Sequence, residues 1–344
     1  MLETPPVPGP PAVSVIVPAR NEEACLGACL QSLFCQKGVS FEIIVVNDGS
    51  SDRTGDIARS FEAVRVIESG FLPLGWTGKN NALTAGARVA RGRWLLFTDA
   101  DTVHLPGALA RAVAEAEHQA AALLSYSPAQ EVHGFWENSV TPVIFAELAA
   151  TYPPSRVSDP DSSLAAANGQ YLLISRAVYD AVGGHAAVAT SLLEDVALAR
   201  AVKASGRKIF FRFAGDAVHT RMYRSFRQLR EGWTKNLVLL FPAAGRLALW
   251  RLLEFALNLA SLVLLVIAVR NGDWGRALLY LAVPVVTVGR ISRAHFPWGA
   301  TILAVLGLPI FSYLLLRSKV VHRWGQVSWK GRSYGRRATT VRVP

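Results

Sequence analysis

Residues 41–60, FEIIVVNDGSSDRTGDIARS, decide the fold of this chain. Residues 41–46 are rich in β-branched side chains, as in a buried strand, and Asn47-Asp48-Gly49-Ser50 then has the composition of a turn. Residues 51–60 follow with a polar start that is typical of a short helix. A strand that ends in a polar turn and leads into a helix is the repeating unit of α/β domains.

The same unit recurs on both sides of this stretch. Further strands are predicted at 13–18, 64–68, 93–98, 120–127, 170–175 and 208–213, and helices at 21–36, 79–90, from 106 onward and at 194–205. This alternation predicts an α/β fold with a doubly wound, mostly parallel sheet. Ligands of such sheets bind at the carboxyl ends of the strands, which is where Asp48 and Asp99 fall.

Charge is distributed unevenly along the 344 residues. Residues 1–216 contain 17 Lys and Arg against 22 Asp and Glu, whereas residues 217–344 contain 19 against three. The basic half is also the apolar half, so we expect an anionic membrane as a partner and no nucleic acid. With 51% hydrophobic and 18% charged residues, the chain is too apolar for a disordered protein.

Two segments in the second half have the length and composition of membrane spans, residues 247–269 and 297–316. Between them, residues 277–289 are uncharged for only 13 residues and contain Pro284, so we expect a re-entrant or interfacial segment. The tail from residue 317 carries eight Lys and Arg and no acid, which places it in the cytoplasm by the positive-inside rule. Two spans are therefore expected rather than three.

These features divide the chain into five expected parts. They are a disordered Pro-rich N-terminus (1–12), a catalytic domain (13–216), a basic amphipathic helical region (217–246), membrane or re-entrant helices (247–316) and a basic tail (317–344). The N-terminus lacks the apolar core of a signal peptide, so we expect a multi-pass inner (plasma) membrane protein with a cytoplasmic catalytic domain. Arg221, Arg224, Arg227 and Arg230 recur every third residue, which predicts either an interfacial or a solvated basic helix.

The strongest chemical signal is Thr98-Asp99-Ala100-Asp101, directly after an apolar strand. Carboxylates at this spacing provide the hard oxygen ligands that Mg²⁺ or Mn²⁺ prefers, although the same pattern also occurs in simple turns. Asp48 can accept hydrogen bonds from a base or ribose, or can cap the next helix. Lys79 stands at a helix start, where it favours an anion, unless this segment is only a capped loop.

A second acidic pair, Glu194-Asp195, opens another predicted helix. Either acid could offset the helix dipole, or one could serve as a general base that takes a proton from an acceptor hydroxyl. The sequence has no dinucleotide fingerprint, P-loop, G-x-S-x-G or H-E-x-x-H motif, which excludes those enzyme classes. Cys25, Cys29 and Cys35 match no metal-binding spacing, and we expect them to be buried as small hydrophobic residues.

Taken together, these residues resemble the family 2 inverting glycosyltransferases of the GT-A fold. The resemblance rests on residues 15–23, 46–52, 98–101 and 194–195. The donor-binding residues that it implies are Pro18, Ala19, Glu22, Asp48, Lys79, Asp99 and Asp101. It further implies that Asp99 and Asp101 hold a divalent cation, Mg²⁺ or Mn²⁺, and that Asp195 is the catalytic base.

Within the family, the segments WTGKN (76–80), GWTKN (232–236) and WKGR (329–332) are similar to the bacterial branch that glycosylates carotenoids or is associated with hopanoids. The resemblance implies transfer from a nucleotide sugar, a UDP-hexose by family habit, to a hydroxyl or carboxyl of a membrane lipid or isoprenoid. On the acceptor and membrane side we expect Glu194, Arg227, Arg230 and Trp233. The alternatives are a small processive polysaccharide synthase, whose Q-x-x-R-W motif is incomplete here, and an inactive glycosyltransferase-like membrane scaffold.

Overall fold

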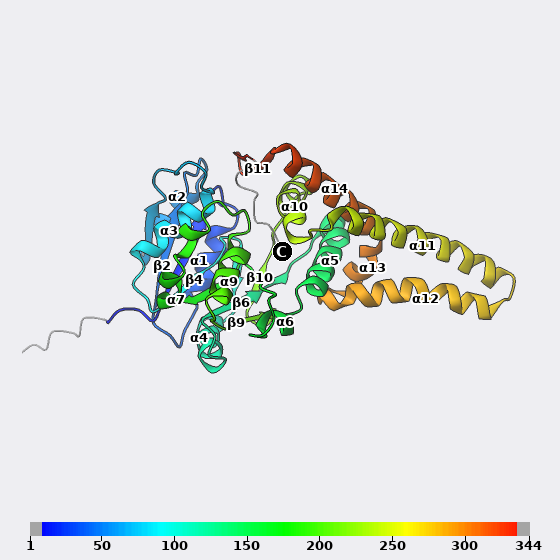
Figure 1. Ribbon diagram of the computed structural model, residues 1–344, viewed down its shortest axis with the longest axis horizontal. Coiled ribbons are helices and arrows are strands. Elements are labelled where there is room, and N and C mark those ends of the chain that lie inside the picture. Colours follow the sequence, from blue (N-terminus) through cyan, green and yellow to red (C-terminus); the bar gives the residue numbers. More distant parts are fainter. Residues whose placement is uncertain (1–8, 336–344) are drawn as a thin grey trace, which may run out of the picture. The chain divides into compact units, whose positions relative to one another are not determined.

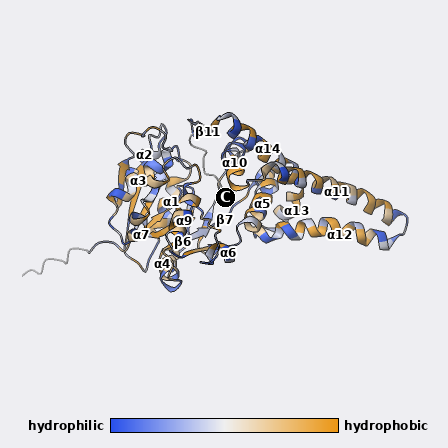
Figure 2. Ribbon diagram, viewed as in Figure 1, coloured by the Kyte–Doolittle hydropathy of each residue, from blue (hydrophilic) through white to orange (hydrophobic). Residues whose placement is uncertain are grey.

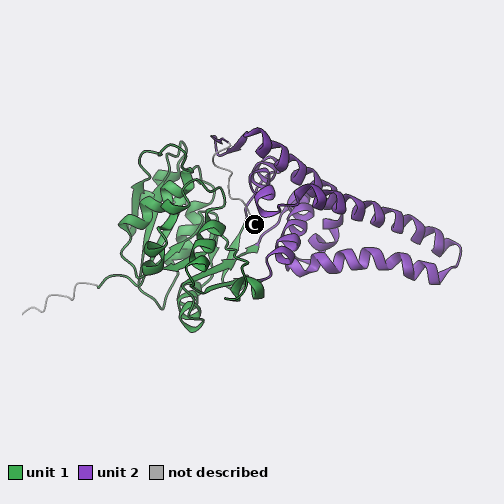
Figure 3. Cartoon of the chain, viewed as in Figure 1, with its two compact units in different colours: residues 1–129, 154–220 green, residues 130–153, 221–344 purple. Residues whose placement is uncertain are grey.

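The computed structural model describes residues 9–335, so the expected disordered N-terminus and basic tail lie partly outside the described residues. The chain forms two compact units (Figure 3): unit 1 comprises residues 1–129 and 154–220, and unit 2 comprises residues 130–153 and 221–344. The boundary differs from the expected linear one at residues 130–153. This segment belongs to unit 2 because its helix α5 (Gly134–Thr151) packs against other helices of that unit.

Unit 1 is built on a sheet with the strand order β3-β2-β1-β4-β8-β6-β9 (Figure 1). The strands are β1 (Val13–Ala19), β2 (Phe41–Asn47), β3 (Val64–Glu68), β4 (Trp94–Phe97), β6 (Leu123–Ser127), β8 (Leu172–Ser175) and β9 (Ile209–Phe213). Strand β8 pairs antiparallel with both β4 and β6, and the other neighbours pair parallel. The predicted mostly parallel α/β sheet is therefore confirmed.

The helices of unit 1 are α1 (Leu26–Phe34), α2 (Thr54–Arg59), α3 (Gly78–Val89), α4 (Ala108–His118), α6 (Pro154–Ser158), α7 (Arg176–Ala181), α8 (Gly184–Ala187) and α9 (Glu194–Ala204). A smaller sheet has the order β5 (Thr102–His104), β10 (Val218–Thr220) and β7 (Ala129–Gln130). Helix α1 begins later than expected because Asn21 has a left-handed φ of 53° and its N–H donates to the hydroxyl of Ser50. Cys29 is buried, but Cys25 is half-buried and Cys35 is exposed, so the expected burial of all three cysteines is wrong.

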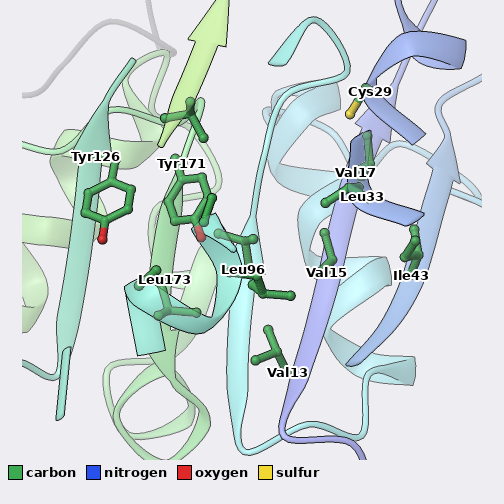
Figure 4. Close-up of a cluster of buried hydrophobic side chains, with 14 of the residues drawn as sticks. Val13, Val15, Val17, Cys29, Leu33, Ile43, Leu96, Tyr126, Tyr171 and Leu173 are labelled. Carbon is green, nitrogen blue, oxygen red and sulfur yellow. The ribbon is translucent and has the colours of Figure 1, made fainter. Parts of the chain in front are cut away.

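Alternate residues of β1 form the centre of the main core. Val13, Val15 and Val17 point to one face of the sheet, where Cys29 and Leu33 of α1 cover them (Figure 4). Buried side chains of β2, β4, β6 and β8 extend this layer. Ser14 and Ile16, which point to the other face, are also fully buried, so β1 is covered on both faces, as is typical of a central parallel strand.

Unit 2 is mainly helical. Besides α5 it contains α10 (Phe226–Leu240), α11 (Ala244–Arg270), α12 (Trp274–Ile291), α13 (Trp298–Leu303), α14 (Leu308–Trp324), two short 3₁₀ segments (Ser292–Ala294 and Ala304–Gly307) and the hairpin β11 (Val327–Trp329) and β12 (Arg332–Tyr334). Within residues 9–335, three helical stretches are long and apolar enough to cross a membrane: Ala244–Arg270, Trp274–Ala294 and Trp298–Trp324. Figure 2 shows hydrophobic residues along most of α11 and α12.

The expected short length of the segment at 277–289 is wrong. Helix α12 continues through Pro284 and extends beyond the uncharged run at both ends. Its charged residue Arg290 is neutralised inside unit 2, where the guanidinium lies 3.0 Å from the carboxylate of Glu254 in α11. The charged residues that end the uncharged run in the sequence are paired in the structure. Counting uncharged residues therefore underestimated the length of the helix.

The expected row of four arginines on one helix is also wrong. Helix α10 begins only at Phe226, with Ser225 as its N-cap, so Arg221 and Arg224 precede it. The guanidinium of Arg221 lies 2.9 Å from the carboxylate of Glu137 in α5.

The close approach of α3 to the sheet can be tested at Gly86. A methyl group at this position would lie 2.5 Å from Ile16 Cγ2 and 3.0 Å from Val46 Cγ2. We expect Gly86→Ala to destabilise the protein by about 1–3 kcal/mol through overpacking, which outweighs the gain in helix propensity of about 1 kcal/mol. The measurement is the thermal unfolding midpoint of the purified chain in detergent, which should decrease.

Gly27 in α1 provides the matched control. A methyl group there would meet only Ile57 Cγ2, at 3.9 Å. Gly27→Ala should therefore raise the midpoint, with a stabilisation of about 0.4–1 kcal/mol. Equal shifts for the two variants would contradict the close packing at Gly86.

Candidate active site

Three parallel strands bring the first group of candidate residues to one edge of the sheet. Strand β1 pairs with β2 on one side and β4 on the other. Pro18 and Ala19 end β1, Asp48 directly follows β2, and Asp99 follows β4 after one further residue. Because neighbouring strands lie about 4.8 Å apart, these residues occupy one short stretch of the carboxyl edge.

Asp48 is buried in the turn after β2. Its carboxylate accepts a hydrogen bond of 2.9 Å from the hydroxyl of Ser69, and its main-chain carbonyl accepts one of 2.6 Å from the guanidinium of Arg20. The alternative role of Asp48 as a helix cap is wrong. It is Asp52 whose carboxylate accepts from the N–H of Thr54, the first residue of α2. The structure thus leaves Asp48 as a candidate for ligand recognition.

Lys79 connects the two acidic segments. Its ammonium nitrogen lies 2.7 Å from Asp99 Oδ1 and 2.7 Å from Glu194 Oε1. Only 8% of the Glu194 side chain is exposed, against about a third for the other two. Burial lowers the pKa of Lys79, but the charges of Asp99 and Glu194 outweigh burial and hold this pKa well above its usual range. The side chain is therefore a permanent cation between two carboxylates.

The start of α3 positions this cation. Thr77 is the N-cap, and its hydroxyl accepts from the N–H of Asn80. The Asn80 side-chain amide donates to the carbonyls of Val188, Ala189 and Ser191, at 2.9, 3.0 and 3.1 Å. These bonds hold the segment that precedes α9 against the first turn of α3, so the two helix starts meet.

Asp195 lies in the first turn of α9 with both carboxylate oxygens hydrogen-bonded. Oδ2 accepts from the N–H of Gly169 and Oδ1 from the N–H of Val196, each at 2.8 Å. Burial, together with the charge of Glu194, raises the pKa of Asp195 to about 6, and Lys79 and the two hydrogen bonds partly oppose this rise. A carboxylate with a pKa in this range is suited to accept a proton near neutral pH.

Gly169 faces all three of these charged groups. A methyl group at this residue would lie 3.2 Å from Lys79 Nζ, 3.3 Å from Glu194 Oε1 and 3.5 Å from Asp195 Oδ2. The absence of a side chain thus leaves a small space that the ammonium and both carboxylates adjoin.

A second set of contacts ties this region to the end of β4. The hydroxyl of Thr98 donates to the carbonyl of Gln170 at 2.8 Å. The Gln170 side chain donates to the hydroxyl of Thr220, which in turn donates to the carbonyl of Asp101 at 3.1 Å. The predicted residues Asp99, Asp101 and Asp195 therefore come from segments that are bonded to one another inside unit 1.

The donor set fits a divalent cation that is shared with a ligand. Asp99 and Asp101 supply carboxylate oxygens, which Mg²⁺ and Mn²⁺ prefer. In the part of the chain that the structure describes, no group of three or more His, Cys, Asp and Glu side chains gathers to hold an ion unaided. Divalent cations such as Mg²⁺ are commonly held by one or two carboxylates together with substrate phosphates and water.

The remaining predicted residues lie elsewhere. The main-chain N–H of Glu22 donates to the hydroxyl of Thr54, which fixes the loop after β1 over the start of α2. In unit 2, Arg227 is exposed and Arg230 is half-buried on α10. Trp233 is only 2% exposed and belongs to the core of unit 2, so its ring does not form an outer surface.

Three residues at this site were not predicted from the sequence: Arg20, Ser69 and Gly169. Ser69 directly follows β3, so the rule that ligands bind at the carboxyl ends of strands would have found it. Gly169 stands shortly before β8, and a glycine at such a position often marks a close approach of other groups. Arg20 directly follows the predicted pair at the end of β1.

The fold is that of a glycosyltransferase of the GT-A type. Residues 14–182 match the family model described as glycosyl transferase family 2, so the chain contains a glycosyltransferase domain of this kind. The 4,4'-diaponeurosporenoate glycosyltransferase of Staphylococcus aureus strain MRSA252 is 29% identical over 342 residues, which cover 94% of this chain and 88% of that protein. Its counterpart in strain USA300 is 28% identical over 344 residues, with the same coverage.

A solved structure is similar across almost the whole chain. It is the mannosyltransferase PcManGT from Pyrobaculum calidifontis in complex with GDP-Man and Mn²⁺, with 18% sequence identity and a TM-score of 0.52. The match covers 92% of this chain and 88% of that one. At this level of identity the similarity supports the fold.

The space at Gly169 leads to a prediction about turnover. Gly169→Ala should displace the Lys79 ammonium by a few tenths of an ångström, since 3.2 Å is closer than an ordinary contact. Because small misplacements of reacting groups slow catalysis strongly, we expect kcat to decrease by about tenfold. Steady-state sugar transfer measures the effect, with Gly27→Ala as the control, because a methyl group there meets only Ile57 Cγ2 at 3.9 Å. A kcat equal to that of the unmodified chain would show that the reaction does not use this space.

Proposed function

We propose that this enzyme transfers a hexose from a UDP-sugar to a hydroxyl or carboxyl group of a membrane isoprenoid or lipid, such as a carotenoid or hopanoid. The observation that carries the proposal is the meeting of Lys79, Glu194 and Asp195 around Gly169. The ammonium of Lys79 also binds Asp99 at the end of β4. The acceptor class is supported by the relatives, which are named for a carotenoid acid, and by the three long apolar helices.

The donor half of the site follows from the carboxyl edge of the sheet. Pro18, Ala19, Glu22 and Asp48 would surround the nucleotide, and Asp99 and Asp101 would hold Mg²⁺ or Mn²⁺ against its diphosphate. When bound, the cation would neutralise the charge that develops on the leaving diphosphate. Lys79 would contribute a second positive charge from the start of α3, where main-chain N–H groups also favour an anion.

The proposed reaction is a single displacement with inversion. Asp195 accepts the proton of the acceptor hydroxyl, and that oxygen attacks the anomeric carbon on the face opposite the diphosphate. The carbon–oxygen bond to the diphosphate breaks, and the nucleoside diphosphate leaves with the bonding electrons. A carboxylate acceptor is already ionised and attacks without proton transfer, so Asp195 is required only for hydroxyl acceptors.

An apolar acceptor requires an enzyme at a membrane. We infer a multi-pass protein of the plasma (inner) membrane with the catalytic domain, residues 13–216, in the cytoplasm, where nucleotide sugars occur. Arg227 and Arg230 in the basic region 217–246 would bind anionic lipid, at about 1 kcal/mol per charge. Nucleic acid has no role in this proposal.

Mass spectrometry of total lipids tests the function directly. Cells with and without the protein are compared, and the expected result is a lipid species heavier by one hexose. A ladder of products with many sugars would instead favour a polysaccharide synthase. Unchanged lipids in cells that accumulate the folded protein would contradict the proposal.

Replacing the proposed base should stop transfer to a hydroxyl acceptor. Asp195→Asn keeps the shape of the side chain but removes its basicity, and general bases contribute about 10²–10⁴-fold, so we expect kcat to fall by a factor in this range. In the unmodified enzyme, kcat/KM should fall as the pH decreases through about 6, because Asp195 becomes protonated there.

Two controls accompany this experiment. Asp180→Asn, at an exposed carboxylate, should retain the parental rate, and both variants should bind UDP as the unmodified chain does. Full turnover by Asp195→Asn with a hydroxyl acceptor, or a rate that is flat between pH 5 and pH 7 (about one unit on either side of the pKa), would refute the assignment.

Removal of divalent cations provides a separate prediction. Excess chelator should abolish transfer, and Mg²⁺ or Mn²⁺ should restore it. Asp101→Asn should raise the metal concentration needed for half-maximal activity by at least about tenfold, since a lost ligand weakens the site. Asp56→Asn, at a largely exposed carboxylate of α2, is the control that should leave this concentration unchanged. Full activity in excess chelator would remove the cation from the mechanism.

A further inference from the structure

The loop of residues 69–76, SGFLPLGW, exposes two large apolar side chains almost completely. Phe71 is 88% exposed and Leu74 is 102% exposed. Elsewhere in the described part of unit 1, the large exposed apolar side chains reach only 36–39%. Even the outward-facing residues of the three long apolar helices do not exceed 70%. Exposing apolar side chains to water costs free energy. An exposed apolar surface of this kind is typical of an interaction site.

The loop is anchored at its base. The Asn81 side-chain amide donates to the carbonyls of Ser69 and Phe71, at 3.1 and 3.3 Å. Gly70 and Gly75 flank the tip with φ values of 73° and 84°, a backbone conformation that side chains rarely adopt. The two apolar side chains are therefore presented by a defined turn, in a loop without any charged residue.

The position of this loop connects it to the active site. It links β3 to α3, so one end carries Ser69, whose hydroxyl donates to Asp48, and the other leads into the helix of Lys79. A surface that holds Phe71 and Leu74 would thus lie beside the carboxyl edge of the sheet.

We propose that the 69–76 loop inserts its tip into the interfacial region of a lipid bilayer. Side chains that project this far do not form the concave site that an isoprenoid ligand needs. Two residues also provide far less area than the roughly 800 Å² per partner of a stable protein interface. Insertion of Phe and Leu between lipid headgroups requires neither a concave site nor a large interface. A lipid bilayer is also the partner that fits a chain with three helices long and apolar enough to cross a membrane.

Fluorescence quenching by lipids tests the insertion with the full chain in vesicles of phosphatidylcholine and phosphatidylglycerol. Cys25→Ser and Cys35→Ser remove the accessible thiols and leave the buried Cys29. Leu74→Cys then carries a small environment-sensitive fluorophore. The matched control is His118→Cys, an exposed position at the end of α4, which leads into β6 and so lies at the amino edge of the same sheet.

The label at position 74 should show blue-shifted emission and at least about twofold stronger quenching than the label at position 118. Quenching should be stronger with a spin label near the headgroup than deep in the acyl chain, because interfacial segments insert only about 5–10 Å. Adding Phe71→Ser to the Leu74→Cys chain should weaken the quenching. Retained binding of UDP shows that each variant is folded.

Three outcomes would overturn the proposal. Equal quenching at positions 74 and 118 would show that the tip does not enter the bilayer. A spectral change that requires added isoprenoid would show that the tip binds the acceptor. A spectral change that depends on protein density, without quenching by lipid, would show that the tip contacts a second copy of the chain. None of these measurements involves sugar transfer, so the proposed activity and the docking of the loop can fail separately.

Discussion

The ammonium group of Lys79 is the interaction on which the active site depends. The carboxylates of Asp99 and Glu194 each lie 2.7 Å from it, and the carboxylate of Asp195 adjoins the same space at Gly169. Without a cation among them, their mutual repulsion and the burial of Glu194 would favour separation of the two segments. The positive charge of the ammonium thus compensates the carboxylates at the point where the end of β4 and the start of α9 come together.

The sequence predicted the parts of this arrangement that follow from local pattern. Alternating strands and helices predicted a parallel sheet, and the carboxyl ends of β1, β2 and β4 must then share an edge. Asp48 and Asp99 could therefore be placed at the same edge of the sheet from the sequence. The assignment of Asp195 required the family resemblance, because nothing in the local sequence relates α9 to β4.

What could not be predicted depends on contacts between distant segments. The N–H of Gly169 donates a hydrogen bond to Asp195, although the two residues belong to different segments. The sequence around a single glycine before a strand does not indicate which residue it will contact. The length of α12 was missed for a related reason. Arg290 interrupts an apolar run in the sequence, but its charge is compensated by Glu254 of α11, and that pairing is a tertiary property.

Opposing contributions set the pKa of Asp195, and a bound donor would alter them. Burial and the charge of Glu194 raise its pKa, whereas Lys79 and two main-chain N–H groups lower it. Lys79 is also the group that a diphosphate would attract. If the ammonium moved away from Asp195 toward such an anion, its lowering effect would weaken and the pKa of Asp195 would rise further. Because a stronger base accepts a proton more readily, the same contact would bind the donor and prepare Asp195 for the acceptor.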